Sequence, residues 1–463
     1  MNTQKKVSGF AIKALALAMT ALSSQAFAQG YQIDEQSARR LGDAFSGGAA
    51  EARDASTTHY NPAGLVRLKQ TELTGGVSVL TTKVEFTGTA ITFDPSDTSG
   101  SGTGNAPVIG NGAESSSSDA VPNLYFATPL REGTVLGIAL NAPFASSTDY
   151  GSSSVVRYQS LESEVTGARL TLSLGQEISP AFSVGLGLIV QRMEGSITNA
   201  IDSASYCSIG SAMSGGVLPT CGTAGTPDQD GRVKYEGDDI AFGYSLGLLY
   251  NLNDSTRLGF AYRSAIKNEL EGSASVQIPA AVEPVTSMVS PFLSTHSESA
   301  KFDLTTPESL SLSAFHQLNE KFNLQADVTW TRWSRFEALD IKTASGEGDV
   351  TQEENWKNNW RVAVGGEYQT TEQLALRAGL AWDQSPVPDE SRNISFPLDD
   401  FKAISIGLTY AFSPALALDA GLQKTLDFDS DVNDGDVNTS YSQANGNSES
   451  STWSAAVGLN WKI

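Results

Sequence analysis

Apolar and polar residues alternate along most of this chain. In residues 403–412, isoleucine, leucine, tyrosine and phenylalanine occupy the even positions, and small or polar residues occupy the odd ones. Successive side chains of a strand point to opposite faces, so the pattern predicts strands with one apolar face. A soluble sandwich turns that face inward and a membrane barrel turns it toward lipid, and alternation alone fits both.

The lengths of the connections distinguish these two folds. The pattern predicts fourteen strands, near residues 72–87, 119–130, 133–143, 156–178, 181–199, 238–252, 255–271, 300–317, 321–341, 354–370, 372–386, 398–412, 414–430 and 450–463. Links of one or a few residues, such as Ser179-Pro180 and Asn253-Asp254, alternate strictly with long links, such as 200–237 and 272–299. Short turns at one end and long loops at the other are typical of outer-membrane barrels. We therefore expect an all-β fold, a 14-stranded antiparallel transmembrane β-barrel built by residues 71–463.

The last predicted strand supports closure of this barrel. Trp453, Ala455, Val457, Leu459, Trp461 and Ile463 form one apolar face that runs to the end of the chain. An unpaired strand edge is costly in lipid, so this strand should pair with the first.

The first 28 residues have the pattern of an export signal. Lys5, Lys6 and Lys13 precede a short apolar run from Ala14 to Leu22, and Ala26-Phe27-Ala28 matches a cleavage site. The alternatives are a membrane anchor or a buried helix, but the apolar run is too short to span a membrane. We expect cleavage after residue 28 and export to the outer membrane.

Charge and cysteine content narrow the function. Without the three basic residues of the signal, 27 basic side chains face 52 acidic ones, a net charge of −25. Such a chain repels nucleic acid. The only cysteines, Cys207 and Cys221, should form a disulfide in an oxidising compartment, with two free thiols as the alternative. We expect no metal site and no cofactor, because histidines are few and scattered and no phosphate-binding loop is present.

Residues 29–70 break the period-two pattern. Helical spacing from Glu35 to Phe45 ends at Gly47-Gly48, and a second helical turn is predicted around Asn61-Pro62-Ala63-Gly64. A compact segment before the first strand predicts a plug in the lumen, and a periplasmic tail is the alternative.

Several motifs, spread over nearly the whole mature chain, carry a specific resemblance. They are Gly42-Asp43-Ala44-Phe45-Ser46-Gly47, Asp54, Asn61-Pro62-Ala63-Gly64, Asn141-Ala142-Pro143-Phe144, residues 359–365, and residues 383–388 with Arg392. In this order they resemble the FadL-type family (OMPP1/FadL/TodX) of outer-membrane transporters for long-chain fatty acids and other hydrophobic compounds. Ala145 departs from the family pattern, which has a glycine there, and Ile463 takes the place of the terminal aromatic residue that is usual in outer-membrane barrels.

The resemblance implies a 14-stranded barrel with an N-terminal hatch over residues 29–70. It also implies a passive route, in which loops capture a hydrophobic ligand, a pocket binds it against the hatch, and a gap beside the third strand releases it sideways. The lateral gate would be Asn141, Ala142, Pro143 and Phe144. The expected partners are a long-chain fatty acid or another hydrophobic small molecule, outer-membrane lipid and lipopolysaccharide, and the protein is expected to act as a monomer.

Physical requirements suggest further site residues. The loop 272–299 is unusually apolar for an exposed segment, and the expected capture residues are Val285, Met288, Val289, Phe292 and Leu293. The expected pocket residues are Ile33, Leu41, Phe45 and Leu65. A carboxylate would need a cation, and the inward candidates are Arg169, Arg257, Arg361 and Arg377. The alternatives are that the loop packs on itself, that the hatch residues only pack the plug, and that inward acidic residues neutralise the arginines.

Three other functions remain as alternatives. Uptake of aromatic or alkane hydrocarbons would use a similar protein. A general porin or surface adhesin would have no need of a hatch, and a porin would give a large steady current. An enzyme is disfavoured, because no Ser-His-Asp set can be assembled around His59 or His316.

Overall fold

The structure is a computed structural model that describes residues 30–93, 105–215, 221–426, 428–435 and 442–463. The predicted signal peptide lies outside these residues. No helix within them is long and apolar enough to cross a membrane.

The chain consists mainly of strands. They are β1 (Glu72–Phe93), β2 (Asn105–Pro107), β3 (Ala113–Arg131), β4 (Thr134–Asp149), β5 (Glu162–Ser179), β6 (Phe182–Ile201), β7 (Gly231–Asn253), β8 (Thr256–Arg263), β9 (Ile266–Gln277), β10 (His296–Thr306), β11 (Ser309–Gln317), β12 (Phe322–Thr331), β13 (Ala338–Thr343), β14 (Val350–Glu353), β15 (Asn359–Gln369), β16 (Leu374–Asp383), β17 (Phe401–Ala411), β18 (Leu416–Thr425), β19 (Phe428–Gly435) and β20 (Ser442–Lys462). The helical elements are α2 (Ala38–Leu41), α3 (Thr57–Tyr60), η1 (Pro62–Arg67), α4 (Ser203–Met213), η2 (Pro227–Gln229), α5 (Glu283–Val289), η3 (Trp333–Arg335) and η4 (Asp389–Ser391).

The strands close into one barrel. β1 pairs with β3 on one side and with β20 on the other, and the seam with β20 runs from Glu72–Lys462 to Thr92–Ser442. Some barrel strands are interrupted, so that two consecutive strands share one position in the wall. The six such pairs are β2 with β3, β8 with β9, β10 with β11, β12 with β13, β14 with β15, and β18 with β19. The predicted 14-stranded antiparallel barrel is thereby confirmed.

Several strands are longer than the alternation predicted. β1 continues to Phe93, and β3 already begins at Ala113, within a stretch that was expected to be a loop. The added part of β3, residues 113–118, consists mostly of serine and shows no apolar alternation, yet Phe86 and Ala113 still pair across the sheet. Outside the membrane, strands can pair through their backbones without an apolar face. Hydrophobic alternation therefore marks only the membrane-spanning part of each strand.

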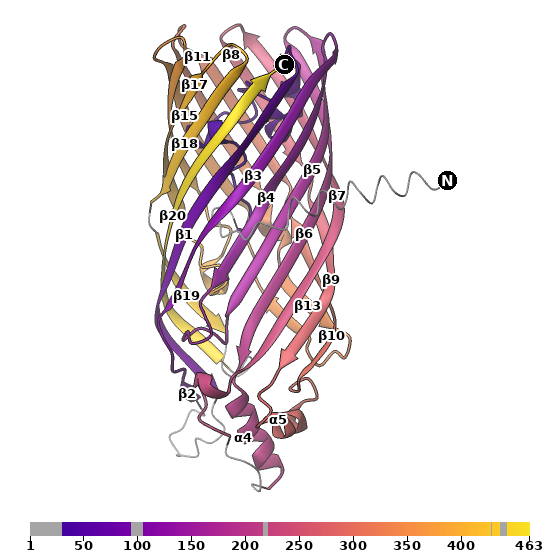
Figure 1. Ribbon diagram of the computed structural model, residues 1–463, viewed down its shortest axis with the longest axis vertical. Helices are drawn as coiled ribbons and strands as arrows, with labels where there is room; N and C mark the ends of the chain where they lie inside the picture. Colours follow the sequence, from indigo (N-terminus) through magenta and orange to yellow (C-terminus); the bar gives the residue numbers. More distant parts are fainter. Residues whose placement is uncertain (1–29, 94–104, 216–220, 427, 436–441) are drawn as a thin grey trace, which may run out of the picture.

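The two faces of the wall differ as expected for a membrane barrel. On β17, Ile406 is 57% exposed on the outer face, whereas its neighbour Ser405 is 1% exposed on the inner face. Short turns and the C-terminus lie at the top of Figure 1, and α4 and α5 lie at the bottom, where the long loops gather. Since long loops are extracellular in such barrels, the top of Figure 1 is the periplasmic end.

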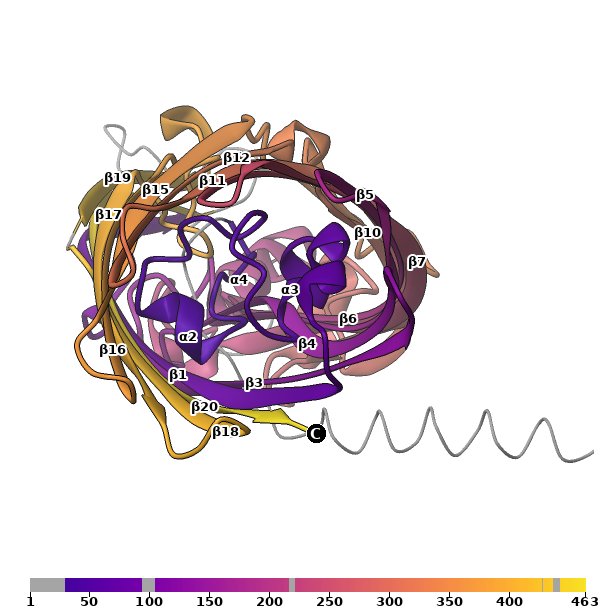
Figure 2. The same ribbon diagram turned by 90° about the horizontal axis from the view of Figure 1, so that it is seen from above.

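The segment 30–70, called the hatch below, lies inside the barrel (Figure 2). Its first helix is much shorter than predicted: α2 ends at Leu41, and Ala44 and Phe45 adopt positive φ values of 56° and 58°. Inward glycines allow close packing of the hatch, because a Cβ at Gly379 or Gly407 would collide with the hatch backbone.

The hatch also contacts both strands of the closing seam. Ser78 of β1 donates a hydrogen bond to the backbone oxygen of Glu35 (3.1 Å), and Ser454 of β20 donates one to Oε1 of the same residue (2.9 Å).

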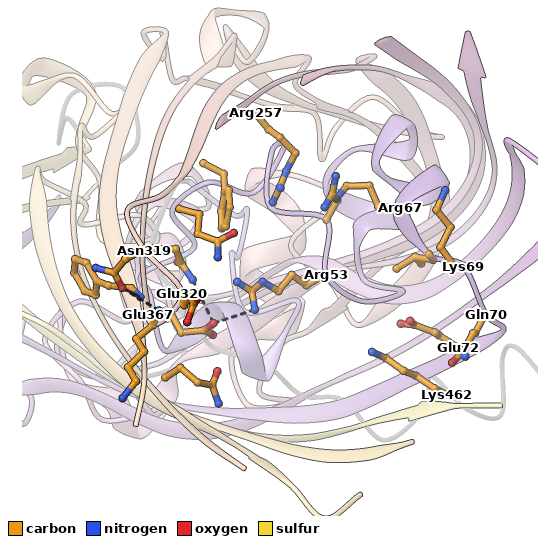
Figure 3. A pocket seen from close by; sticks show the side chains of 18 residues that line it. Arg53, Arg67, Lys69, Gln70, Glu72, Arg257, Asn319, Glu320, Glu367 and Lys462 are labelled. Carbon is orange, nitrogen blue, oxygen red and sulfur yellow. Dashed lines mark hydrogen bonds and ion pairs between the residues drawn. The ribbon is translucent and has the colours of Figure 1, made fainter. Parts of the chain in front are cut away.

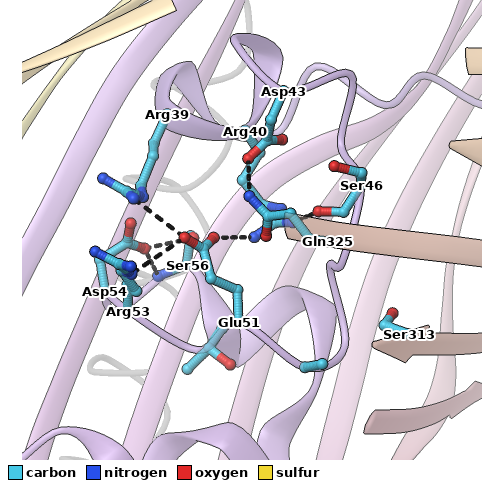
Figure 4. Close-up of polar contacts among 12 residues, drawn as sticks. Arg39, Arg40, Asp43, Ser46, Glu51, Arg53, Asp54, Ser56, Ser313 and Gln325 are labelled. Carbon is cyan, nitrogen blue, oxygen red and sulfur yellow. Dashed lines mark hydrogen bonds and ion pairs between the residues drawn. The ribbon is translucent and has the colours of Figure 1, made fainter. Parts of the chain in front are cut away.

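A buried ion-pair network holds the hatch against the wall (Figure 4). The carboxylate of Glu51 contacts Arg39 at 3.1 Å, Arg40 at 2.5 Å and Arg53 at 3.3 Å. Arg39 extends the network to Glu367 of β15 and to Asp419 of β18. Burial alone would raise the pKa of Glu51, but the arginine charges outweigh burial and hold this pKa well below its usual value. Glu51 is therefore charged and central to docking of the hatch.

We expect the substitution Glu51→Gln to loosen the hatch. It removes the negative charge that three arginines share, and breaking a buried ion pair in this way costs about 3–5 kcal/mol. In planar bilayers the variant should show frequent open-channel currents, whereas the wild-type protein should stay closed. Asp254→Asn, in the exposed β7–β8 turn, is the matched control. Equal currents from all three proteins would contradict a docking role for Glu51.

Candidate functional site

The wall is interrupted between β3 and β4. Their backbone pairing ends at Asn123–Asn141, and among the described residues no pairing between these strands continues toward the extracellular end. β4 instead bulges after Asn141 and resumes its pairing with β5 at Phe144. Pro122 and Pro143 flank this point, and neither can donate a backbone hydrogen bond to a neighbouring strand. The predicted gate residues thus lie at the place where two wall strands separate.

The start of the hatch covers this place. Ile33 donates its backbone N–H to the oxygen of Pro143 (3.0 Å), and Ala145 donates its own to the oxygen of Tyr31 (2.9 Å). The side chain of Ile33 packs with Leu80, Val121 and Ala145. Residues 31–33 therefore act as a short added strand on β4.

Polar side chains join the same hatch segment to the bulge. Gln36 donates to the oxygen of Ala142 (2.9 Å) and accepts from Nδ2 of Asn141 (3.0 Å). Asn141 also contacts Nδ1 of His59 (2.9 Å). Burial, assisted by the charges of Arg263 and Arg169, holds the pKa of His59 well below its usual value, so its ring is neutral.

Aromatic rings fill the lumen between the hatch and the extracellular loops. The ring of Tyr31 lies 4.7 Å from Trp333 and 5.8 Å from Phe144, measured between centroids. Trp356 lies 5.1 Å from Trp333, and Phe336 and Phe396 complete this aromatic cluster. The largest set of buried apolar side chains in the described residues surrounds these rings. An apolar ligand entering from the loops would meet this cluster before the hatch.

A buried carboxyl group borders the aromatic cluster. Glu354 accepts hydrogen bonds from Nε1 of Trp356 (2.9 Å) and from Nδ2 of Asn393 (3.0 Å). Burial is the main cause that raises the pKa of Glu354 to about 8. The group is therefore mainly neutral at pH 7, and a charge appears beside Trp356 only in alkaline solution.

We expect alkaline pH to loosen the aromatic cluster through Glu354. Its pKa is higher in the folded protein than in an unfolded chain, so it stabilises the fold at low pH, and this contribution is lost as pH rises through about 8. Tryptophan fluorescence should shift to the red with a midpoint near that pH. Glu354→Gln should remove the transition, and Glu353→Gln, an exposed neighbour, should retain it. A transition that persists in Glu354→Gln would contradict this assignment.

A cavity of about 70 Å³ lies between the hatch, the bulge and the wall. Phe45, Ile33 and Pro143 line it together with Arg169, Arg263 and Arg361. It therefore combines the predicted gate and hatch with two of the four predicted headgroup arginines.

Two arginines of this cavity form no ion pair within the described residues. Arg263 donates to the backbone oxygen of His59 (2.8 Å), whereas Arg169 keeps a donor without a partner. Its Nε donates to Gln191 (2.7 Å), but within the described residues Nη2 is buried without a hydrogen-bond partner and no carboxylate lies within ion-pair distance. The guanidinium lies 4.6 Å from the ring centroid of Phe144. A buried donor without a partner is costly, so an anionic ligand at this place would be stabilised.

The other three predicted arginines are engaged elsewhere. Arg361 pairs with Asp34 at 2.8 Å, and Arg377 pairs with Glu367 and Asp419, each at 3.2 Å. Arg257 donates to backbone oxygens of the hatch and lines a different cavity at the periplasmic end.

The predicted pocket residues do not form one pocket. Ile33, Leu65, and the pair of Leu41 with Phe45 belong to three separate apolar clusters. All four side chains are buried, and of the four only Ile33 and Phe45 reach the small cavity. The motif residues Gly42, Ser46, Gly47, Asn61, Pro62 and Ala63 shape the hatch; Asn61, for example, donates to the oxygen of Leu248 in the wall (3.0 Å).

The predicted capture loop is mostly packed. Val285 and Leu293 are buried, Val289 and Phe292 are half-buried, and only Met288 is exposed (54%). α5 packs against α4, whose Met213 is 67% exposed. A disulfide joins Cys207 of α4 to Cys221, with Cα atoms 5.4 Å apart. Most apolar side chains of the loop are therefore buried by local packing. Met213 and Met288, on two neighbouring helices, are still exposed and available to a ligand.

Sequence reasoning missed several members of this site. Arg263 lies six residues after Arg257 on the same predicted strand, and this even spacing could have placed it on the inner face. The contacts of Gln36 and His59 with Asn141 had no signal in the sequence, because they depend on how the hatch folds. No group of three or more metal-ligating side chains occurs in the described part of the chain.

Known proteins share both the sequence and the fold. The family model described as "Outer membrane protein transport protein (OMPP1/FadL/TodX)" matches residues 19–462. The chain is 28% identical to the long-chain fatty acid transport protein of Escherichia coli O6:H1, over 89% of this chain and 90% of that protein. It is 29% identical to outer membrane protein P1 of Haemophilus influenzae, over 88% of each chain.

Solved structures agree with this fold. A Pseudomonas aeruginosa FadL homologue has a TM-score of 0.81 at 23% identity, covering 94% of this chain and 99% of its own. The Pseudomonas putida toluene transporter TodX has a TM-score of 0.67 at 18% identity, covering 92% and 98%. Family and barrel together place the protein in the bacterial outer membrane, as a transport protein and not an enzyme. The chain belongs to the OMPP1/FadL/TodX family of outer-membrane transport proteins.

Proposed function

We propose that this protein passively transports long-chain fatty acids or similar hydrophobic molecules across the outer membrane. The observation that carries this proposal is the break in pairing between β3 and β4, covered from inside by hatch residues 31–33. A plugged barrel with a break in its side wall suits a ligand that prefers lipid to water. A general porin needs neither feature.

Capture would begin at the extracellular tip. Met213 and Met288 expose flexible apolar side chains on α4 and α5, and methionine adapts to ligands of different shapes. The ligand would then enter the aromatic cluster, where it would exchange water for ring contacts.

Binding would continue in the small cavity beside the hatch. Its volume of about 70 Å³ holds a headgroup and not a whole chain, so the apolar tail would have to displace part of the aromatic cluster. Arg169 would receive the carboxylate. The ring of Tyr31 lies within the cluster, and the backbone of the same residue pairs with β4, so displacement of this ring would also pull residues 31–33 from the bulge. Ligand binding could thus shift the hatch between two arrangements.

Release would occur sideways between β3 and β4. With residues 31–33 removed, the bulged edge of β4 would be uncovered beside lipid, and an apolar ligand would leave without crossing the periplasmic half of the hatch. Deletion of Pro143 tests this step, because it removes one bulge residue and restores a donor to the strand. Uptake should fall several-fold while the barrel still assembles. Unchanged uptake would argue against lateral release.

Uptake of aromatic hydrocarbons is the second candidate. The aromatic cluster favours it, because tilted and edge-to-face rings could accept another ring in place of Tyr31. The toluene transporter TodX has a similar fold, although at 18% identity that likeness shows the fold alone.

One experiment tests the proposed function and separates these substrates. A host strain that lacks its own fatty-acid carrier would express this protein, and uptake of radiolabelled oleate and toluene would be compared with the empty vector. Oleate uptake supports the first candidate and toluene uptake supports the second. Uptake of neither, or a large steady current from the purified protein in planar bilayers, would overturn transport by this route.

A further inference from the structure

Figure 3 shows a second cavity, of about 660 Å³. Residues of the short β11–β12 turn line it, so it opens at the periplasmic end of the barrel. This periplasmic basin lies between the end of the hatch and the wall. No step of the proposed transport route uses it.

The basin is basic, although the whole chain carries a formal net charge of −22. Its cationic lining residues are Arg53, Arg67, Lys69, Arg257, Lys321 and Lys462, and its acidic ones are Glu72, Glu320 and Glu367. Glu367 is already shared by Arg39, Arg53 and Arg377. The three acidic lining residues therefore cannot neutralise all six cationic ones.

Two arginines face each other in the basin without an acid between them. The guanidinium groups of Arg67 and Arg257 point toward one another from the hatch and from the wall (Figure 3). Arg257 is 6% exposed and donates only to the backbone oxygens of Ala50 and Glu51, both at 3.1 Å. Within the described residues, neither guanidinium forms an ion pair, and that of Arg67 forms no hydrogen bond.

The electrostatics of this pair favour an anion. Arg67 and Arg53 both repel Arg257, and Glu51 is the acid that offsets part of this repulsion. Arg67 is exposed at the mouth of the basin, yet partial desolvation and then the charge of Arg53 lower its pKa. A planar guanidinium offers paired donors that match the oxygens of carboxylate or phosphate. An oxyanion between the two groups would replace repulsion by charge-assisted hydrogen bonds.

We propose that the periplasmic basin binds an oxyanion, a phosphate or carboxylate group, between Arg67 and Arg257. This site is separate from the transport route, so a test of anion binding here does not depend on the proposed function. The oxyanion could belong to a small soluble molecule or to a lipid headgroup, and the donors would be the same.

Calorimetry on the purified protein in detergent at low ionic strength tests the site. Inorganic phosphate and acetate represent soluble anions, and dihexanoylphosphatidic acid represents a lipid headgroup. We expect saturable binding of at least one of them, weakened by added sodium chloride. Binding of the lipid that is about tenfold tighter than that of phosphate would identify a lipid source. Binding of the lipid that is no tighter than that of phosphate would identify a soluble source.

Variants assign the binding to the two arginines. Arg67→Gln alters an exposed residue and should fold, and it should weaken binding by about tenfold or more, the effect of losing charge-assisted bonds. Arg257→Gln should have a similar effect, with folding checked by heat-modifiable migration in gels. Arg192→Gln, whose side chain pairs with Glu194 and Asp238 on the outer surface, should bind as the wild type does. Absence of saturable binding in the millimolar range, or binding that survives Arg67→Gln, would overturn the proposal.

Discussion

A disulfide between the hatch and the gate, made by Gln32→Cys with Phe144→Cys, is expected to abolish uptake. Gln32 and Phe144 form an antiparallel bridge, and the hydrogen bonds on either side of it run from Ile33 to Pro143 and from Ala145 to Tyr31. This is the narrow kind of pair, with Cα atoms about 4.5 Å apart, which lies within the range that a disulfide spans. The cross-link would fix residues 31–33 over the break in the wall.

The measurement is oleate uptake by cells, before and after reduction. Cells with the oxidised double mutant should take up no more oleate than cells with the empty vector. Reduction of the disulfide should restore oleate uptake to the level of the single mutants. A disulfide made by Ser275→Cys with Ser297→Cys joins β9 to β10 only and should leave uptake unchanged. The single mutants control for loss of the Phe144 ring and for reduction of the native Cys207–Cys221 bond. Full uptake by the oxidised double mutant would show that ligands pass without movement of the hatch.

The substitution Arg169→Gln is expected to remove the preference for charged ligands. A hydrogen bond to a charged group contributes about 1.5–3 kcal/mol, which corresponds to roughly 10- to 150-fold in affinity. Oleate should lose that factor, whereas methyl oleate, which has the same tail without a charge, should bind as before. The ratio of the two affinities is therefore the informative quantity.

This comparison separates a binding role from a packing role. Arg169 also lies against the ring of Phe144, so its removal could disturb the gate itself. In that case both ligands would lose affinity equally and their ratio would stay unchanged, which would contradict recognition of the carboxylate. Arg361→Gln offers a contrast, because its guanidinium is already paired with Asp34 and with the backbone oxygen of Ala44. It should affect stability of the hatch more than selectivity.

The fold could be predicted because it depends on local regularities. Lipid requires an apolar outer face, and a closed barrel requires neighbouring strands to be connected by turns at alternate ends. Both requirements are visible in residues close together in the sequence. The prediction was wrong for the helix from Glu35 to Phe45, because the ionic contacts of Arg39 and Arg40 and the close approach of Gly42 to Gly407 set the backbone there. None of these contacts is local.

The site was harder to predict for the same reason. The four inward arginines looked equivalent in sequence, and only the register between strands shows that Arg377 has acidic partners while Arg169 has none in the described part of the chain. The bulge between Asn141 and Phe144 was not predicted, and only the family resemblance had singled out these residues as a gate. The contribution of Tyr31 could not be foreseen, because its partners Trp333 and Trp356 lie some 300 residues away along the chain.

The seam between β1 and β20 has a consequence for the order of assembly. These strands are the first and the last of the barrel wall and pair along almost their whole length, so the barrel cannot close before its last strand has been exported. The hatch precedes β1 and is already present at that moment. Glu35 accepts hydrogen bonds from Ser78 and Ser454, one on each side of the seam, so a hatch that folds early would serve as an internal template on which the two edges meet.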